Sequence, residues 1–229
     1  VGNYTEEKIK KAMHILKEDF AGFDAQLIIM DVVPWMLPYY EASGIQFEIE
    51  DNRDYMDYTF TPEQFLAGMD TQDDRYRYNY FKRRFAYETE EITPFHREEI
   101  REFMEREWCG EKTCEECHCG CLLRVIDNLV PVFDKIRING ILVRVEGKMA
   151  GLCIVSCRNG LGVYQYKNAV NRIKGINEYL LRESFERYLQ SADTINYTED
   201  MGVENLRYYK EHMAPAHTLL SKLTLTERG

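Results

Sequence analysis

The hydrophobic period of the chain changes at Ile136, and this change constrains the fold more than any other feature. Beyond it, apolar and polar residues alternate, which is the period of a half-buried strand rather than of a helix. Two tight-turn signals, Glu146-Gly147 and Arg158-Asn159-Gly160, interrupt the alternation and predict an antiparallel meander. Its three predicted strands cover residues 135–146, 148–157 and 161–169.

The segment after the meander returns to helical spacing and then alternates again. We expect a helix over residues 175–190, a strand at 194–197, a helix over 203–212 and a last strand at 217–225. A three-stranded meander followed by helix, strand, helix and strand is the element order of the GNAT acyltransferase core, which this half of the chain resembles. The resemblance implies an α/β fold with a mixed sheet.

The first half of the chain also mixes helices with strands. Thr5 precedes an amphipathic pattern that predicts a helix to residue 20, and Thr61-Pro62 and Thr93-Pro94 are typical of helix starts. We place a domain boundary near residues 86–92. The other segments expected here are strands at 25–31 and 45–49 and helices at 34–42 and 122–133.

Net charge and apolar run lengths limit the classes of function. The chain has 229 residues and a formal net charge of −10, which argues against bulk binding to nucleic acid or to an anionic membrane but leaves room for a local basic patch. Its longest apolar stretch, Met149–Val155, is far shorter than the roughly 20 residues of a membrane span. With no signal-peptide pattern at its start, we expect a cytoplasmic protein.

A glycine-containing hexapeptide lies between the third predicted strand and the following helix. The hexapeptide Arg172-Ile173-Lys174-Gly175-Ile176-Asn177 is similar to the GNAT phosphate loop, although Asn177 stands where that pattern has Gly or Ala. Backbone N–H groups at a helix N-terminus bind pyrophosphate, and glycine allows close approach. A plain strand-to-helix turn is the alternative. The candidate cofactor-binding residues are Lys167, Arg172, Lys174, Gly175 and Asn177.

Several blocks of sequence together resemble one family. They are Tyr164–Ala169, Lys174-Gly175, Ile195–Gly202, and Leu206-Arg207 with Lys210 and Pro215. The pattern is similar to the DUF2156 family, which resembles the C-terminal domain of phosphatidylglycerol lysyltransferases. One departure is Lys167-Asn168-Ala169, where the family has Glu-Lys-Ala. The resemblance implies tandem GNAT-like domains, related to those of the Fem peptidyltransferases, with a partial first domain at residues 1–88 and a second at 89–229.

Transfer on a GNAT-like fold needs a base for the acceptor, an oxyanion donor and an acid for the leaving group. A backbone N–H around Lys167–Val170 is a candidate oxyanion donor, and Glu199 or Asp200 is a candidate base. Arg207 and Lys210 share a helix face and are candidates for a phosphate or carboxylate clamp. The alternative is that these four charged side chains form a buried structural network.

The segment Arg75–Phe85 interleaves cations with aromatic rings, as surfaces that bind single-stranded nucleic acid do. A transferase that uses aminoacyl-tRNA needs such a patch, so tRNA is a candidate partner here. The alternative is a solvated element whose Arg side chains pair with Asp70, Asp73 and Asp74.

A cluster of cysteines has spacings that suit zinc. Cys114, Cys117, Cys119 and Cys121 contain one CxxC and two CxC steps, and thiolates at this spacing can chelate zinc from a turn. A Cys-rich stretch without metal is the alternative, because cysteine also packs as a small apolar residue.

Two classes of function therefore stay open. The first is an acyl- or aminoacyl-transferase that takes an acyl group from aminoacyl-tRNA or acyl-CoA and delivers it to an amine or hydroxyl on a lipid, peptide or small molecule. The second is a catalytically inactive binding or regulatory protein on the same fold. A metal or redox sensor built on the Cys cluster is a third interpretation.

Overall fold

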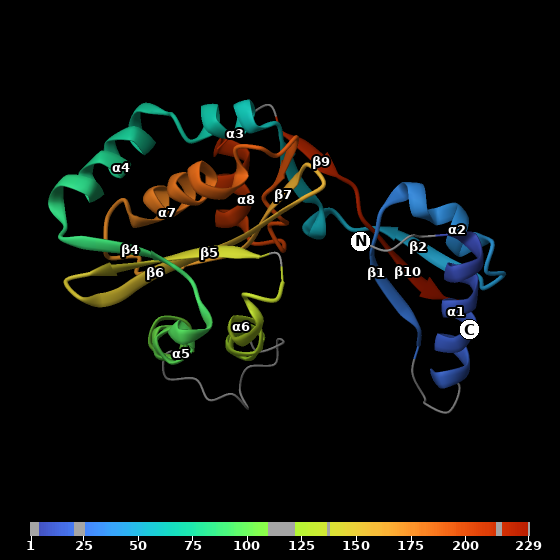
Figure 1. The fold of residues 1–229 in the computed structure, drawn as a ribbon. Helices are drawn as coiled ribbons and strands as arrows, with labels where there is room; N and C mark the ends of the chain where they lie inside the picture. Colours follow the sequence, from blue (N-terminus) through green and yellow to red (C-terminus); the bar gives the residue numbers. More distant parts are fainter. Residues whose placement is uncertain (1–4, 21–25, 110–121, 137, 214–216, 229) are drawn as a thin grey trace. The chain divides into compact units, whose positions relative to one another are not determined.

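The computed structural model describes residues 5–20, 26–109, 122–136, 138–213 and 217–228 (Figure 1). The chain forms two compact units. Unit 1 comprises Val1–Tyr58, Thr198–Lys210 and Thr218–Gly229, and unit 2 comprises Thr59–Tyr197 and Glu211–His217. This division differs from the predicted boundary between residues 88 and 89, because C-terminal segments return to unit 1. That residues 1–88 are part of a first GNAT-like domain stays a prediction.

Unit 1 is built on an antiparallel sheet in the order β1-β10-β2. Helix α1 packs on one face of it, where Ile9, Met13 and Ile45 form a small core with Leu27 and Ile29. The elements of this unit include α1 (Glu6–Phe20), β1 (Ile28–Val32), α2 (Leu37–Glu41), β2 (Phe47–Asp51) and β10 (Leu223–Glu227), and α8 (Glu204–Met213) begins in it.

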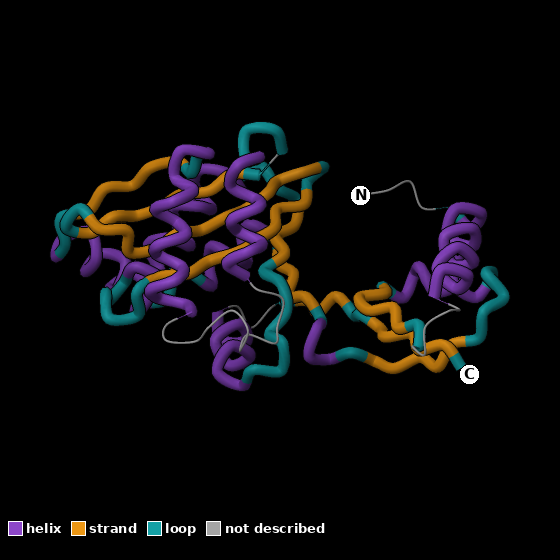
Figure 2. The backbone as a smooth tube through the Cα atoms, turned by 90° about the horizontal axis from the view of Figure 1, so that it is seen from below, coloured by secondary structure: helices purple, strands orange, loops and turns teal. Residues whose placement is uncertain are grey.

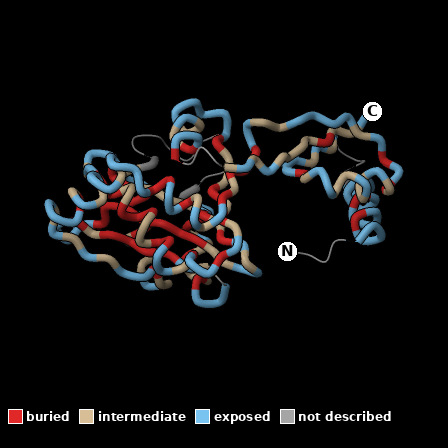
Figure 3. The backbone as a smooth tube through the Cα atoms, turned by 90° about the horizontal axis from the view of Figure 1, so that it is seen from above, coloured by how far each residue is buried: buried red, intermediate tan, exposed pale blue. Residues whose placement is uncertain are grey.

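Unit 2 contains the main sheet, whose strands run in the order β4-β5-β6-β7-β8-β3. The predicted antiparallel meander is confirmed as β5, β6 and β7, and β8 joins β7 in parallel. The buried backbone is concentrated in these central strands (Figure 3). The strands are β3 (Asp57–Phe60), β4 (Tyr87–Glu91), β5 (Asn139–Val145), β6 (Lys148–Arg158), β7 (Leu161–Ala169) and β8 (Thr194–Asn196).

Helices cover both faces of this sheet. Helices α4 and α7 lie over one face and α5 and α6 over the other, as Figures 1 and 2 show. Two of them continue into a π-helical turn, α5 at Glu105–Cys109 and α7 at Phe185–Leu189. The helices are α3 (Pro62–Gly68), α4 (Gln72–Arg84), α5 (Arg97–Met104), α6 (Leu122–Leu129) and α7 (Ile176–Ser184).

Three strands differ from the sequence-based expectation. Strands β3 and β4 were not predicted, and the single strand expected at 217–225 is two strands, β9 (Thr218–Leu220) and β10. The break falls at Lys222, whose carbonyl accepts from the Asn52 N–H (2.9 Å) and whose amine pairs with Asp57 (2.7 Å). Strand β4 is rich in glutamate and becomes a strand through its pairing with β5.

A close approach of α4 to the start of α7 fixes the surface described below. Gly175 is the residue before α7 and has a left-handed backbone with φ of +86°. A Cβ atom there would collide with the carbonyl of Arg77 in α4. On the next turn, Tyr179 stacks on Tyr78 and contacts Phe81 at centroid distances of 5.9 and 4.8 Å. Glycine is therefore required at 175 by packing and by conformation together.

We expect Gly175→Ala to lower the free energy of unfolding by about 2 to 4 kcal/mol, because it adds a steric conflict with α4 to the cost of the left-handed backbone. Gly147→Ala is the matched control, since Gly147 also has a positive φ (+75°) but has no atom within 4 Å of the added Cβ. The control should lose only about 1 kcal/mol. Denaturant unfolding measures both, and equal losses would contradict the close approach of α4.

Candidate functional site

Strand β7 is open along part of one edge. It pairs with β6 over its whole length but with β8 only at Leu161–Val163, so residues 164–169 have no strand partner on that side within the described chain. A bulge at Gln165 marks the start of this opening, because Tyr166 and Tyr164 pair with consecutive residues of β6. Bulges of this kind commonly lie next to active sites.

The open edge contains the predicted oxyanion region. The Val170 N–H already donates to the Ala150 carbonyl at 2.8 Å, and the Asn168 N–H points to β6 in the same way, which leaves the N–H groups of Lys167 and Ala169 as the candidates. The side-chain amide nitrogen of Asn168 is buried and has no hydrogen-bond partner among the described residues. An unpaired buried donor is uncommon in a folded protein and can mark a place for a ligand oxygen.

Lys167 and Asn177 meet, as two of the predicted cofactor-binding residues. The Lys167 amine donates to the Asn177 side-chain oxygen at 3.0 Å, which joins β7 to the first turn of α7. Burial lowers the pKa of Lys167, and the nearby Cys153 and Glu178 oppose this effect. The protonated form of Lys167 is therefore less favourable than that of a solvent-exposed lysine.

The other predicted phosphate-loop residues lie on the same unit but point to different neighbours. Arg172 is 77% exposed and its closest acidic group is Glu107, at 3.7 Å. Lys174 extends toward α4, with its amine 4.6 Å from the ring centre of Tyr76. Gly175 has no side chain to cap α7, so the first-turn N–H groups of Asn177 and Glu178 lack an intrahelical acceptor. Unpaired N–H groups at a helix N-terminus favour an anion, so phosphate binding at this turn stays a prediction.

The predicted charged residues of the last third form a network inside unit 1. The Asp200 side chain is fully buried. Its Oδ2 accepts from Arg53 (3.2 Å), Tyr58 (2.7 Å) and Arg207 (3.0 Å). Its Oδ1 accepts from Arg207 and from the Gly202 N–H, both at 2.9 Å.

This network holds Asp200 as an anion. Although burial alone raises a carboxyl pKa, the hydrogen bonds from Arg207, Tyr58 and the Gly202 N–H outweigh it and hold the pKa of Asp200 well below its usual range. A carboxylate that is so strongly stabilised is a poor proton acceptor. Of the two predicted bases, Asp200 therefore has the bonding of a structural residue.

Lys210 supports the same loop from α8. Its buried amine donates to the Glu199 carbonyl at 2.8 Å and to the Thr198 hydroxyl at 3.3 Å. Thr198 has a φ of +57°, which is costly for a β-branched residue and needs such support. The Glu199 carboxylate is half-buried and has no partner in the described ranges, so it is available for chemistry.

Sequence reasoning missed Arg53, Tyr58 and Asp54. Arg53 and Tyr58 bind Asp200, and Asp54 accepts from Arg207 at 2.7 Å. They lie more than 140 residues from Asp200 along the chain, and no spacing in the sequence connects the two segments. The cluster Asp51-Asn52-Arg53-Asp54-Tyr55 is the only signal, and it is typical of any polar turn.

The predicted zinc ligands Cys114, Cys117, Cys119 and Cys121 lie outside the described residues. Within the parts that the structure describes, no group of three or more His, Cys, Asp or Glu side chains could hold a metal ion. No described helix has the length and apolar character needed to cross a membrane.

The family of the chain follows from a match over nearly its whole length. The sequence model of the family described as "Phosphatidylglycerol lysyltransferase, C-terminal" matches residues 1–221. The chain belongs to this family. No curated protein shows a significant match to it.

Solved structures show the same fold at low identity. A conserved protein of unknown function from Bacteroides thetaiotaomicron is 24% identical with a TM-score of 0.76, and the match covers 96% of this chain and 75% of that one. L-PGS from Bacillus licheniformis is 15% identical with a TM-score of 0.67, covering 96% and 73%. A tandem GNAT protein from the clavulanic acid biosynthesis pathway is 11% identical with a TM-score of 0.53, covering 95% and 67%. Family and fold together support an acyl- or aminoacyl-transferase on a GNAT-like fold.

We expect Asp200→Asn to lower the free energy of unfolding by about 2 kcal/mol at pH 7, because Arg53 and Arg207 lose a charged acceptor. Both Arg side chains are about one-third exposed (35% and 32%), so solvent moderates the loss. Since folding lowers the carboxyl pKa, the contribution is full above pH about 4 and declines as the pH falls below it. Asp54→Asn, which removes an exposed acceptor of the same Arg207, should cost less than about 1 kcal/mol. Urea unfolding between pH 3 and 7 measures both, and equal losses would contradict the structural role of Asp200.

Lys167→Met tests the buried amine in a different way. Because folding lowers the pKa of Lys167, the unfolded chain binds more protons than the folded one between the lowered pKa and the ordinary lysine pKa of about 10.4. The stability of the wild type relative to the variant should therefore rise as the pH rises toward about 10. Lys148→Met, at an exposed position of β6, is the control for the loss of one lysine. A difference between Lys167→Met and wild type that does not change with pH would show that the amine is hydrated.

Proposed function

We propose that this protein transfers an aminoacyl group from aminoacyl-tRNA to a hydroxyl or amine acceptor. The observation that carries the proposal is the opening of β7 beside the phosphate-binding geometry at the start of α7. An extended donor can lie along such an edge, where backbone groups replace the missing strand. Membership of the family of phosphatidylglycerol lysyltransferase C-terminal domains supports the same class of reaction.

The chemistry that we propose is a direct displacement at the donor ester. The acceptor oxygen or nitrogen attacks the ester carbon, and the new bond forms as the acceptor loses a proton to a base. The oxyanion then receives hydrogen bonds from the N–H groups of Lys167 and Ala169, and its collapse expels the ribose hydroxyl oxygen, which takes up a proton. No covalent enzyme intermediate is required.

Glu199 stays the candidate base of the sequence prediction, because its carboxylate has no partner among the described side chains whereas Asp200 is fully engaged. Asp200, Arg207 and Lys210 then hold the loop that carries Glu199. Arg172, Lys174 and Asn177 are proposed to hold the donor phosphate, with Lys167 fixing Asn177, while Gly175 lets α7 begin against α4.

A tRNA donor is favoured over acyl-CoA on two grounds. Asn177 replaces the small residue of the usual phosphate loop, and it is bonded to Lys167. The segment Arg75–Phe85 also offers cations and aromatic rings to a nucleic acid, on a chain that is otherwise acidic. A donor of this kind is met in the cytoplasm. The acceptor is a lipid, a peptide or a small molecule.

A binding or regulatory protein on the same fold is the second candidate. The full engagement of Asp200, Arg207 and Lys210 favours it, because three of the four predicted catalytic side chains are used to hold the fold. Such a protein would bind the donor without consuming it.

The deciding experiment incubates the protein with radiolabelled aminoacyl-tRNAs and a phosphatidylglycerol-containing lipid extract, with labelled acetyl-CoA in a parallel reaction. We expect label to move from tRNA to the acceptor, and Glu199→Gln to lower the rate by about 100-fold or more. Glu204→Gln, which removes an exposed carboxylate in the first turn of α8, is the control and should be as active as wild type. Transfer from acetyl-CoA alone would contradict the proposal that the donor is aminoacyl-tRNA. Binding of tRNA without transfer would favour a binding or regulatory protein.

A further inference from the structure

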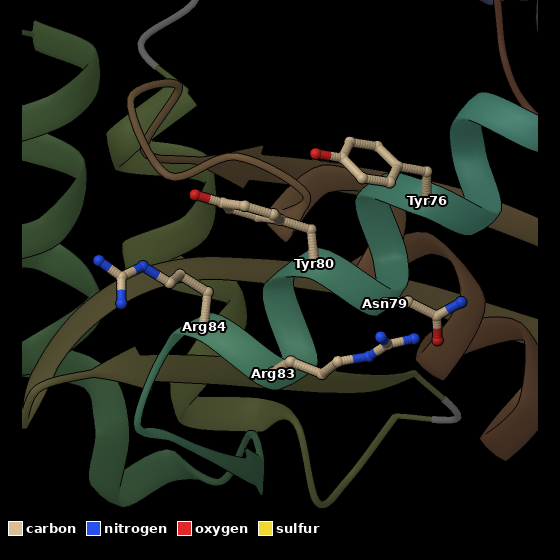
Figure 4. A pocket seen from close by; sticks show the side chains of 5 residues that line it. All are labelled: Tyr76, Asn79, Tyr80, Arg83 and Arg84. Carbon is tan, nitrogen blue, oxygen red and sulfur yellow. The ribbon is translucent and has the colours of Figure 1, made fainter.

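Helix α4 has two faces with different roles. Its inner face packs on α7 through Tyr78 and Phe81, which contact Tyr179. Its outer face follows the helical spacing i, i+3, i+4, i+7 and i+8, and it is lined by Tyr76, Asn79, Tyr80, Arg83 and Arg84 (Figure 4). Because the inner face is fixed by the glycine contact at α7, the outer face is held in one orientation.

A shallow hollow runs along this outer face. Its volume is about 290 Å³, at the lower end of the range for small-molecule sites, so it suits a single ring rather than a large ligand. Tyr76 and Tyr80 stand on the same side of it with ring centres 6.1 Å apart, and Tyr76 is 53% exposed. An exposed ring beside a half-buried one offers stacking surface to a planar ligand.

The cations of α4 divide into paired and free ones. Arg75 pairs with Asp70 (2.8 Å) and Arg77 with Asp73 (2.7 Å). These are ion pairs of the kind that the alternative interpretation of the sequence predicted for this segment. Arg83 and Arg84 have no acidic partner in the described chain, and both lie at the rim of the hollow. A surplus of positive charge therefore persists here on a protein of net charge −10.

A further cation, Lys174, contacts the two tyrosine rings from the loop before α7. The Lys174 amine lies 4.6 and 5.3 Å from the ring centres of Tyr76 and Tyr80. It connects this surface to the loop at Gly175 that is the candidate donor phosphate site. Flat aromatic surface and unpaired guanidinium groups together match a planar ring that is joined to phosphates.

We propose that the outer face of α4 binds unpaired nucleotides of RNA, with a base stacked on Tyr76 and Tyr80 and the adjoining phosphates on Arg83 and Arg84. A duplex would not expose a base for stacking, so the surface should prefer single strands. The choice of RNA rests on the proposed tRNA donor, whose acceptor end is unpaired.

Fluorescence anisotropy with a labelled single-stranded oligoribonucleotide tests this surface without any transfer reaction. The double variant Tyr76→Ala/Tyr80→Ala should weaken binding about 5- to 100-fold. Arg83→Gln/Arg84→Gln should weaken it too, and should reduce the slope of log K against log salt by about 1.4. Arg124→Gln, at an exposed arginine of α6 without a partner in the described residues, should leave both quantities nearly unchanged.

Three results would contradict the proposal that the outer face of α4 binds single-stranded RNA. They are wild-type affinity in both double variants, equal binding of a duplex of the same length, and equal competition by inorganic polyphosphate. Because Arg83 and Arg84 are exposed, their double variant should melt at the wild-type temperature, which keeps the test independent of any stability loss from removing the half-buried Tyr80. Oligonucleotide binding by a protein that shows no transfer activity would support the RNA-binding surface and contradict the proposed transferase function. Transfer from tRNA, together with wild-type RNA affinity in the α4 variants, would support the transferase function and contradict the RNA-binding surface.

Discussion

The packing of α4 on the start of α7 is the contact on which both proposed donor-binding features depend, namely the first turn of α7 and the outer face of α4. It exists because Gly175 has no side chain, which lets the Arg77 carbonyl approach the turn before the helix. The same contact buries Phe81 against Tyr179 and leaves Arg83 and Arg84, which have no acidic partner in the described segments, on the outer face of α4. One glycine thus shapes both a helix start that suits phosphate and a helix face that suits a base, and the two are joined by Lys174.

The charged residues of unit 1 have a different role from the one that their sequence pattern first indicates. Asp200 and Lys210 are buried and bonded in full, so they stabilise the loop at residues 198–202, where Thr198 and Met201 have positive φ. Such a loop keeps an unusual backbone only while its neighbours hold it. Glu199, within the same loop, has no side-chain partner among the described residues, so of the four predicted residues it is the one that stays a candidate base.

Much of the fold of unit 2 can be predicted from the sequence, because the spacing of apolar residues and the residue types at turns are local features of the chain. The meander at 139–169 and the glycine before α7 follow from alternation and turn residues alone. Strand β4 was not predictable, since a glutamate-rich segment becomes a strand only by pairing with β5. The partners Arg53 and Tyr58 of Asp200 were not predictable either, because they approach it only through the tertiary fold. The pairing of Arg75 and Arg77 followed the expected ion pairs, whereas the freedom of Arg83 and Arg84 depends on which acids the fold brings near.

Hydrogen exchange of the intact protein with and without uncharged tRNA tests the central claim most directly, namely that α4 and the start of α7 receive the donor. The account predicts slower exchange at residues 72–84 and 174–179 when tRNA is present, with little change at 204–210 in α8. Protection confined to 204–210, or no protection of α4 at a tRNA concentration that saturates binding, would contradict it.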